Sequence, residues 1–195
     1  MSGKLNLLQK LGLVLVLASC VLLIGSELMA LHNRSAVEKL TAQLRARLPD
    51  VTEGDPGNYS DPEMPVLQLD GQDFSALIQV PAFGVSLPVG SSWDAGRISQ
   101  YPCRFWGSVY DNSLIVGGSS REGQFDFCGR LDLGYKILVT DMTGARFSYE
   151  VIRIDRRSHA DPETLGEADC DLILFARDSG TLDYIIVRCT FASGA

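Results

Sequence analysis

The feature that most constrains the fold is a series of short apolar segments between Val66 and Ala195. They alternate with turns rich in Gly, Pro, Asp and Ser. Segments of this length are typical of strands rather than helices. Strands are predicted at 75–80, 85–89, 104–109, 113–116, 136–140, 146–154, 172–175 and 184–189, with a short helix within 125–133. Eight short strands at this spacing predict an all-β domain, either a closed barrel or a sandwich.

The N-terminus has an apolar run of a different kind. Lys4 and Lys10 precede an uncharged run over residues 11–25, and the apolar character continues to Leu31 with polar residues at 26 and 27. A bilayer-spanning helix needs about 20 apolar residues. The basic flank predicts that the N-terminus lies inside and the following domain outside. We therefore expect residues 1–31 to form a single-pass membrane anchor.

Two alternatives remain open for this segment. One is a cleaved signal peptide. The other is a lipoprotein, because Leu17–Cys20 resembles a lipoprotein cleavage box that would make Cys20 the lipid-bearing N-terminus. The apolar run continues past Cys20, which favours the membrane helix. All three interpretations place the domain outside the cytoplasm, either tethered or secreted.

Residues 32–65 are predicted to be a stalk that joins the anchor to a domain at 66–195. Four apolar residues recur at helical spacing: Val37, Leu40, Leu44 and Leu48. They form one stripe on an amphipathic helix of about four turns, which Pro49 ends. Packing on the chain's own domain or on the membrane surface is favoured over partner binding. Residues 49–65 are rich in Pro, Gly, Asp and Ser, which predicts an extended linker.

Composition argues against several classes of function. The net charge of the chain is −7, whereas a nucleic-acid-binding protein has a basic surface. There is no C-x-x-C motif and there are only two histidines, so no metal site is expected. No cofactor is expected either, because residues 117–120 lack the lysine of a phosphate-binding loop. Trp93 and Trp106 are expected in the core or in the wall of a groove.

Six motifs follow one another in a characteristic order: Ile78–Pro81, Tyr101–Phe105, Leu114–Gly117, Asp141–Gly144, Asp171–Phe175 and Val187–Cys189. Their order and spacing resemble those of the sortases, cysteine transpeptidases of Gram-positive cell surfaces, and most closely the class B and class D-like members. The resemblance implies an eight-stranded barrel on a tethered, extracytoplasmic domain whose groove binds a sorting-signal peptide.

The catalytic positions of the family are replaced in this chain. A sortase uses a cysteine thiolate as nucleophile, a histidine as the acid for the leaving amine and an arginine that stabilises the oxyanion. The matching positions are Gly118, Arg177 and Tyr184. Glycine has no side chain, arginine stays protonated, and tyrosine donates a hydrogen bond without a charge. No catalytic residue is therefore expected. The resemblance implies a degenerate sortase that binds or scaffolds a peptide or cell-surface protein in a groove at these three positions.

Two other functions stay open. A displaced cysteine paired with His159 would give an active transpeptidase or hydrolase. Alternatively the barrel has no ligand, and Tyr184 fills the space above Gly118. The domain contains four cysteines, which in an extracytoplasmic protein predict disulfides. Three pairings are open from the sequence, and the resemblance to sortases favours Cys103 with Cys189.

Overall fold

The computed structural model describes residues 7–158, 165, 169–178, 180, 181 and 183–192, with the backbone alone for residues 7–10 and 24–34. The chain divides into two compact units, residues 1–36 and 37–195. Each unit is described separately below.

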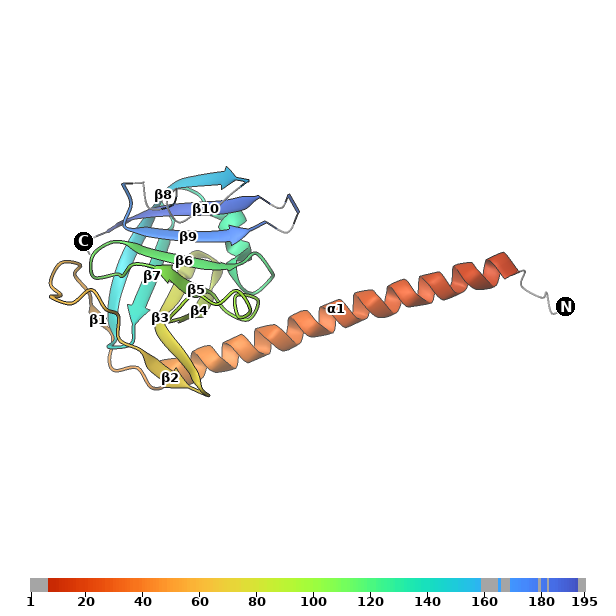
Figure 1. Cartoon of the computed structure of the whole chain (residues 1–195), viewed down its shortest axis with the longest axis horizontal. Helices are drawn as coiled ribbons and strands as arrows, with labels where there is room; N and C mark the ends of the chain where they lie inside the picture. Colours follow the sequence, from red (N-terminus) through yellow and green to blue (C-terminus); the bar gives the residue numbers. More distant parts are fainter. Residues whose placement is uncertain (1–6, 159–164, 166–168, 179, 182, 193–195) are drawn as a thin grey trace. The chain divides into compact units, whose positions relative to one another are not determined.

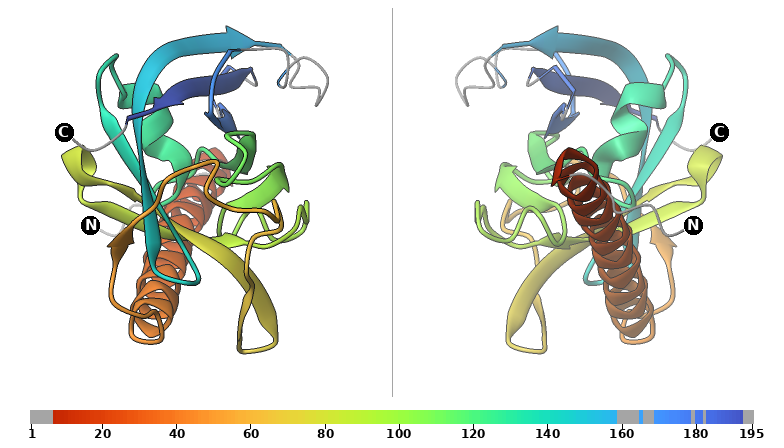
Figure 2. Two further views of the ribbon diagram at one scale, coloured as in Figure 1. Left: turned by 90° about the vertical axis from the view of Figure 1, so that its left-hand side faces the viewer. Right: turned by 90° about the vertical axis from the view of Figure 1, so that its right-hand side faces the viewer.

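Eight strands of the second unit close into a barrel (Figures 1 and 2). Around the barrel their order is β8-β10-β9-β6-β5-β4-β3-β7, and β7 closes the ring by pairing with both β3 and β8. The strands are β3 (Gln72–Val80), β4 (Val85–Gly90), β5 (Cys103–Trp106), β6 (Leu114–Ser119), β7 (Lys136–Asp141), β8 (Ala145–Arg157), β9 (Leu172–Arg177) and β10 (Tyr184–Phe191). The prediction of eight strands is confirmed, and the fold is a barrel rather than a sandwich.

Four smaller elements complete this unit. Two short strands, β1 (Thr52–Glu53) and β2 (Leu67–Leu69), extend the sheet beyond the barrel strands. Two 3-10 helices, η1 (Pro81–Phe83) and η2 (Phe125–Arg130), lie after β3 and β6. The helix predicted within 125–133 is therefore present as η2.

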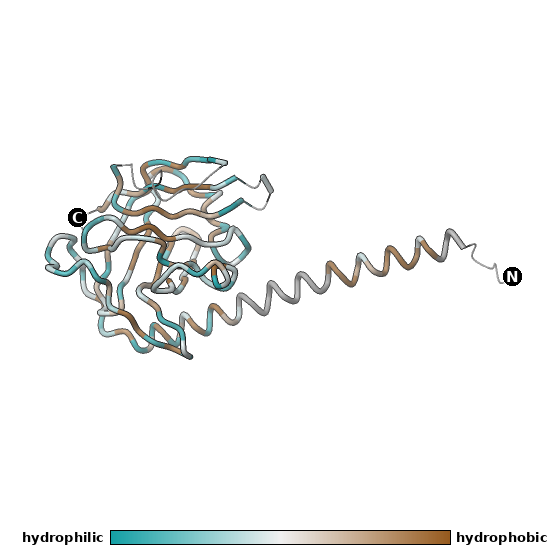
Figure 3. Tube along the Cα trace, in the orientation of Figure 1, coloured by the Kyte–Doolittle hydropathy of each residue, from teal (hydrophilic) through white to brown (hydrophobic). Residues whose placement is uncertain are grey.

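The barrel interior follows from the alternation of side chains along the strands. On β8, Phe147, Tyr149 and Val151 are at most 1% exposed, because every second residue of a strand points to the same face. Phe125 and Phe127 of η2 are fully buried in the same cluster. Figure 3 shows the apolar character of these strands along the chain trace.

The predicted amphipathic helix is the C-terminal part of a longer helix, α1 (Leu7–Arg45). Val37 is 8% exposed and Leu44 is fully buried, and each belongs to a core cluster of the barrel unit. Thr41 Oγ1 donates a hydrogen bond to the carbonyl of Ser86 at 3.4 Å. The stripe thus packs on its own domain, as the sequence favoured.

The segment predicted as a linker also belongs to the barrel unit. Strand β1 pairs in parallel with β8, Met64 is 1% exposed, and the ring of Tyr59 stacks on Tyr110 with centroids 3.9 Å apart. The boundary between the two units lies at Ala36 and Val37 rather than near Pro65. Local composition did not reveal this boundary because apolar residues isolated within a polar segment supply the contacts.

In the first unit, the large apolar side chains between Leu11 and Leu23 are more than half exposed. Among the residues that the structure describes, no helix is long and apolar enough to cross a membrane. The membrane anchor over residues 1–31 is not supported by the structure and stays a prediction.

The disulfide between Cys103 and Cys189 is not present. All five cysteines of the chain are free thiols. Cys103 lies in a cluster with Phe74 and Tyr101, whereas Cys189 lies in the barrel interior. The pairing that the resemblance favoured is therefore wrong, since the two thiols belong to separate hydrophobic clusters.

Candidate functional site

Three polar side chains form a row across neighbouring strands of the barrel. Arg177 at the end of β9 is paired with Ser119 on the parallel strand β6 and with Tyr184 on the antiparallel strand β10. Arg177 is exposed, and the other two residues are partly exposed. The structure thus brings Arg177 and Tyr184 together, as the sequence predicted. We call Ser119, Arg177 and Tyr184 the polar row.

Gly118 does not take part in this row, contrary to the sequence prediction. It is buried and pairs with Ala176, and a Cβ on it would lie 2.8 Å from Cδ2 of Phe125. Gly118 therefore faces the barrel interior. Because side chains alternate along a strand, Ser119 rather than Gly118 takes the outward position beside Arg177. The match of Gly118 to the histidine position of sortases stays a prediction.

An aromatic cluster covers the outer face of the barrel beside the polar row. We call its members, Trp93, Phe105 and Phe175, the aromatic plug. The centroid of Phe105 lies 5.0 Å from that of Trp93 and 5.4 Å from that of Phe175, with the rings nearly perpendicular in both pairs. Tyr184 adjoins the plug, with its centroid 6.4 Å from that of Phe175. Tyr184 thus lies against Phe175 rather than above Gly118.

Gly117 explains how the aromatic plug sits so close to the sheet. A Cβ on Gly117 would lie 2.4 Å from Cζ3 of Trp93 and 2.5 Å from Cζ of Phe175. The two rings therefore rest directly on the backbone of β6, where no side chain fits. Gly117 and Gly118 are neighbours in the sequence, but they face opposite sides of the sheet. Gly117 leaves room for the aromatic plug on the outer face, and Gly118 leaves room for Phe125 in the barrel interior.

Arg188 binds the backbone of Leu165, which lies over the same outer face. Its side chain is only 3% exposed and donates to Asp155 Oδ2 and to the carbonyl of Leu165, both at 3.1 Å. Leu165 is fully buried among apolar side chains of β6, β9 and β10. Burial alone would raise the pKa of Asp155, but hydrogen bonds from Arg188 and Arg153 outweigh burial and lower that pKa below its usual value. Asp155 is therefore ionised in the folded protein, as the buried guanidinium requires.

Cys170 is the cysteine of the barrel that comes nearest to a reactive setting. It is partly exposed, and Nη1 of Arg188 lies 3.8 Å from its Sγ. Burial nevertheless raises the pKa of the Cys170 thiol, although Arg188 acts to lower it. A neutral thiol is a poor nucleophile. His159, its expected partner, lies outside the described residues, so the structure does not test that pair.

The other thiols of the barrel are buried. Burial raises the pKa values of Cys103, Cys128 and Cys189. Among the residues that the structure describes, no group of three or more His, Cys, Asp or Glu side chains could hold a metal ion.

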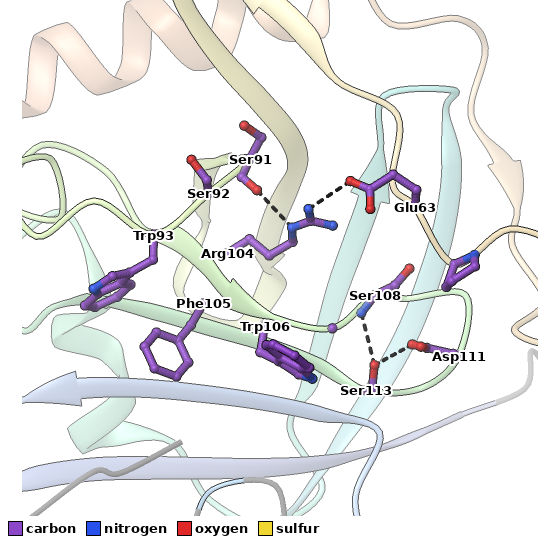
Figure 4. Close-up of a pocket in the computed structure, with 12 residues that line it drawn as sticks. Glu63, Ser91, Ser92, Trp93, Arg104, Phe105, Trp106, Ser108, Asp111 and Ser113 are labelled. Carbon is purple, nitrogen blue, oxygen red and sulfur yellow. Dashed lines mark hydrogen bonds and ion pairs between the residues drawn. The ribbon is translucent and has the colours of Figure 1, made fainter. Parts of the chain in front are cut away.

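A pocket of about 390 Å³ adjoins the aromatic plug (Figure 4). Trp93 and Phe105 form one side of it, and Arg104 and Trp106 from β5 also line it. Trp106 is 70% exposed. The sequence placed both tryptophans in the core or in a groove wall, and the exposure of Trp106 excludes the core. The exposure of Trp106 cannot be inferred from its position along the strand, because a β-bulge between Arg104 and Trp106 interrupts the alternation of inward and outward side chains.

The barrel is similar to those of solved sortases. Sortase D5 from Clostridium perfringens matches with a TM-score of 0.51 and 20% identity over 62% of this chain and 80% of that chain. Sortase A from Corynebacterium diphtheriae matches with a TM-score of 0.56 and 13% identity over 85% of each chain. Sortase C from Clostridium perfringens, solved with the C-terminal cell wall sorting motif, matches with a TM-score of 0.52 and 14% identity over 60% of this chain and 70% of that chain.

At these identities the likeness concerns the fold, and this chain has the fold of the sortases. No family model matches the sequence, and no curated protein matches it. The fold predicted from the six motifs is confirmed.

Proposed function

We propose that this chain is a catalytically inactive sortase-like protein that binds a peptide, or a peptide segment of a cell-surface protein, at the polar row. The observation that carries the proposal is the composition of the row. Ser119, Arg177 and Tyr184 occupy neighbouring positions on three strands, and none of these side chains is a thiol or an imidazole. The row can donate hydrogen bonds, but it lacks the nucleophile and the acid of a sortase.

The chemistry of the row suits a carboxylate. Arg177 supplies a fixed positive charge and a fork of N–H donors, while Tyr184 and Ser119 add hydroxyl donors. Charge-assisted hydrogen bonds of this kind are the stronger ones. The sortase C structure that contains a cell wall sorting motif supports peptide binding by this fold. The ligand we favour is therefore a peptide with a C-terminal carboxylate or an acidic side chain.

The same proposal places the barrel outside the cytoplasm, attached to the membrane by residues 1–31. This part of the proposal rests on the sequence, in which basic residues precede a long apolar run. The exposure of the large apolar side chains between Leu11 and Leu23 is compatible with such an attachment.

Binding to the polar row is tested with sorting-signal peptides made both as the free acid and as the C-terminal amide. We expect the acid to bind the full-length protein more tightly, and Arg177→Ala to weaken its binding about tenfold or more, since hydrogen bonds to charged groups contribute about 1.5–3 kcal/mol. Fluorescence anisotropy with labelled peptides measures both effects. Arg47→Ala, which removes an exposed arginine elsewhere in the barrel unit, is the matched control for net charge. Equal affinity for acid and amide, or no binding of either, would contradict the proposal.

The absence of a thiol nucleophile is tested by labelling the cysteines with a maleimide and mapping the adducts by mass spectrometry. We expect Cys170 to react more slowly at pH 7 than a free thiol, whose pKa is about 8.5, and the buried Cys103, Cys128 and Cys189 to react more slowly still. Because the pKa of Cys170 is raised, its rate should keep increasing as the pH passes the ordinary value, where a free thiol levels off.

The competing function predicts a different labelling pattern. If Cys170 reacted faster than a free thiol at pH 7, and a thiol-reactive sorting-signal peptide formed an adduct there that His159→Ala abolished, the protein would be an enzyme with a displaced cysteine.

A further inference from the structure

The pocket beside the aromatic plug carries an inference that does not depend on peptide binding at the polar row. Its most unusual member is Trp106, whose side chain is 70% exposed on β5. Tryptophan is usually largely buried. Figure 4 shows its indole on one side of the pocket, with Trp93 and Phe105 further along the same side. The pocket therefore offers a flat aromatic platform to solvent.

Arg104 forms the opposite part of the pocket and is fixed in place. Its Nε donates to the carbonyl of Ser91 at 2.9 Å, and its Nη2 pairs with Oε1 of Glu63 at 3.1 Å. The Arg104 side chain is 19% exposed, while that of Glu63 is 71% exposed. A guanidinium that is held at two points loses little conformational freedom when it binds a ligand.

The turn between β5 and β6 forms one end of the pocket and contributes a second polar group, the carboxylate of Asp111. Oγ of Ser113 donates to Oδ1 of Asp111 at 2.5 Å and accepts a hydrogen bond from the backbone N–H of Ser108 at 3.2 Å. Asp111 is exposed. Its carboxylate is thus oriented from within the protein, yet remains accessible as an acceptor.

The aromatic platform and the polar side chains around it restrict the chemical class of ligand that the pocket can bind. The pocket contains fixed donors and fixed acceptors, and Glu63 largely neutralises the charge of Arg104. An anion would meet the carboxylates of Glu63 and Asp111, and a cation would meet Arg104. A purely apolar ligand would remove the exposed carboxylates of Glu63 and Asp111 from water without offering them hydrogen bonds, which costs free energy. A neutral ring with an apolar face and hydroxyl groups at its rim satisfies both the platform and the polar groups.

We propose that this pocket binds a saccharide, with one sugar ring stacked on the indole of Trp106 and its hydroxyls hydrogen-bonded to Arg104, Glu63 and Asp111. The pocket volume of about 390 Å³ falls within the ~300–1,000 Å³ typical of small-ligand sites. Such a site would give the barrel a second binding activity on the outer face beside the aromatic plug.

The test uses the full-length protein in a polyoxyethylene detergent, because detergents with sugar headgroups would compete. Chitotriose, cellotriose and maltotriose are titrated separately, and binding is followed by isothermal titration calorimetry and by tryptophan fluorescence. We expect at least one trisaccharide to bind. Trp106→Ala should weaken that binding about tenfold or more, as is usual for a central aromatic contact, and Trp106→Phe should weaken it less. Arg104→Lys should also weaken binding, because lysine cannot reproduce the two-point contact of the guanidinium.

Leu133→Ala is the matched control, since Leu133 is 67% exposed and does not line the pocket. It should leave the affinity unchanged, and the melting temperatures of all variants show that they are folded. The proposal is overturned if none of the three trisaccharides binds, or if Trp106→Ala binds as tightly as the unmodified protein. It is also overturned if a proline-rich peptide, rather than a sugar, binds in a manner that depends on Trp106, because aromatic-lined grooves also accept such peptides.

Discussion

Replacing Phe175 with alanine is expected to lower the free energy of unfolding by about 4 kcal/mol, since Phe→Ala substitutions in protein cores cost about 3–5 kcal/mol. Phe175 is 5% exposed, and its ring contacts Phe105, Trp93 and Tyr184. The substitution would remove the centre of this aromatic cluster and leave a cavity over the backbone of β6. Urea denaturation followed by circular dichroism measures the change.

Two further variants test whether this cost arises from the contact between Phe175 and the backbone of β6. Trp106→Ala removes a larger side chain, but one that is 70% exposed, so it should cost much less. Gly117→Ala should be destabilising in the unmodified protein, because its Cβ would lie 2.5 Å from Cζ of Phe175. In the Phe175→Ala background its cost should fall, which a double-mutant cycle detects. The fall should be partial, because Cζ3 of Trp93 would still lie 2.4 Å from the new Cβ. If the cost of Gly117→Ala did not fall at all, the ring of Phe175 would not contribute to the crowding at Gly117.

Replacing Asp141 with alanine should lower the free energy of unfolding by about 3 kcal/mol, because donors left buried and unsatisfied cost about 1–3 kcal/mol each. Asp141 is fully buried at the end of β7. Its Oδ1 accepts hydrogen bonds from the backbone N–H groups of Thr143 and Ala145 and from Oγ1 of Thr143, at 2.8 to 2.9 Å. Its Oδ2 accepts from the hydroxyl of Tyr110 at 2.6 Å. The carboxylate therefore closes the turn between β7 and β8.

Asp141→Asn is the matched control for this carboxylate. Its Oδ1 can still accept the three bonds within the turn, and its Nδ2 can donate to the hydroxyl oxygen of Tyr110. Burial is the largest cause of the raised pKa of Tyr110 and is still present in this variant, so the phenol stays protonated and its oxygen can accept. We expect Asp141→Asn to cost about 1 kcal/mol, the usual contribution of one hydrogen bond. If asparagine and alanine cost the same, the charge of Asp141 rather than its hydrogen bonds would stabilise the turn.

Much of the barrel could be predicted from the sequence, because strand formation leaves a local trace. The alternation of Phe147, Tyr149 and Val151 with polar residues marks the inner face of β8, and the pattern alone gives the correct side. The stripe from Val37 to Leu48 likewise indicates a helix that packs on its own domain. In both cases the periodicity of the backbone fixes which side chains share a face.

The two glycines of β6 show why the candidate site could not be predicted fully. The resemblance to sortases matches Gly118 to a catalytic position, and nothing local in the sequence shows which face of the strand it occupies. The pairing of β6 with β9, strands separated by more than 50 residues of chain, decides that Ser119 faces outward beside Arg177. Shifting the assignment by one residue exchanges the inner and outer faces of a strand.

The sequence by itself determined the all-β class, the short strands of the domain, and the absence of cysteine and histidine from positions 118, 177 and 184, while the closure of the strands into a barrel depends on the pairing of β7 with both β3 and β8. The tertiary structure decided that the cysteines stay unpaired, that the barrel unit begins at Val37, and that Trp106 is exposed beside Arg104. The physical reason is that the first group follows from local periodicity and composition. The second depends on contacts between residues distant in the chain, which only the closed barrel brings together.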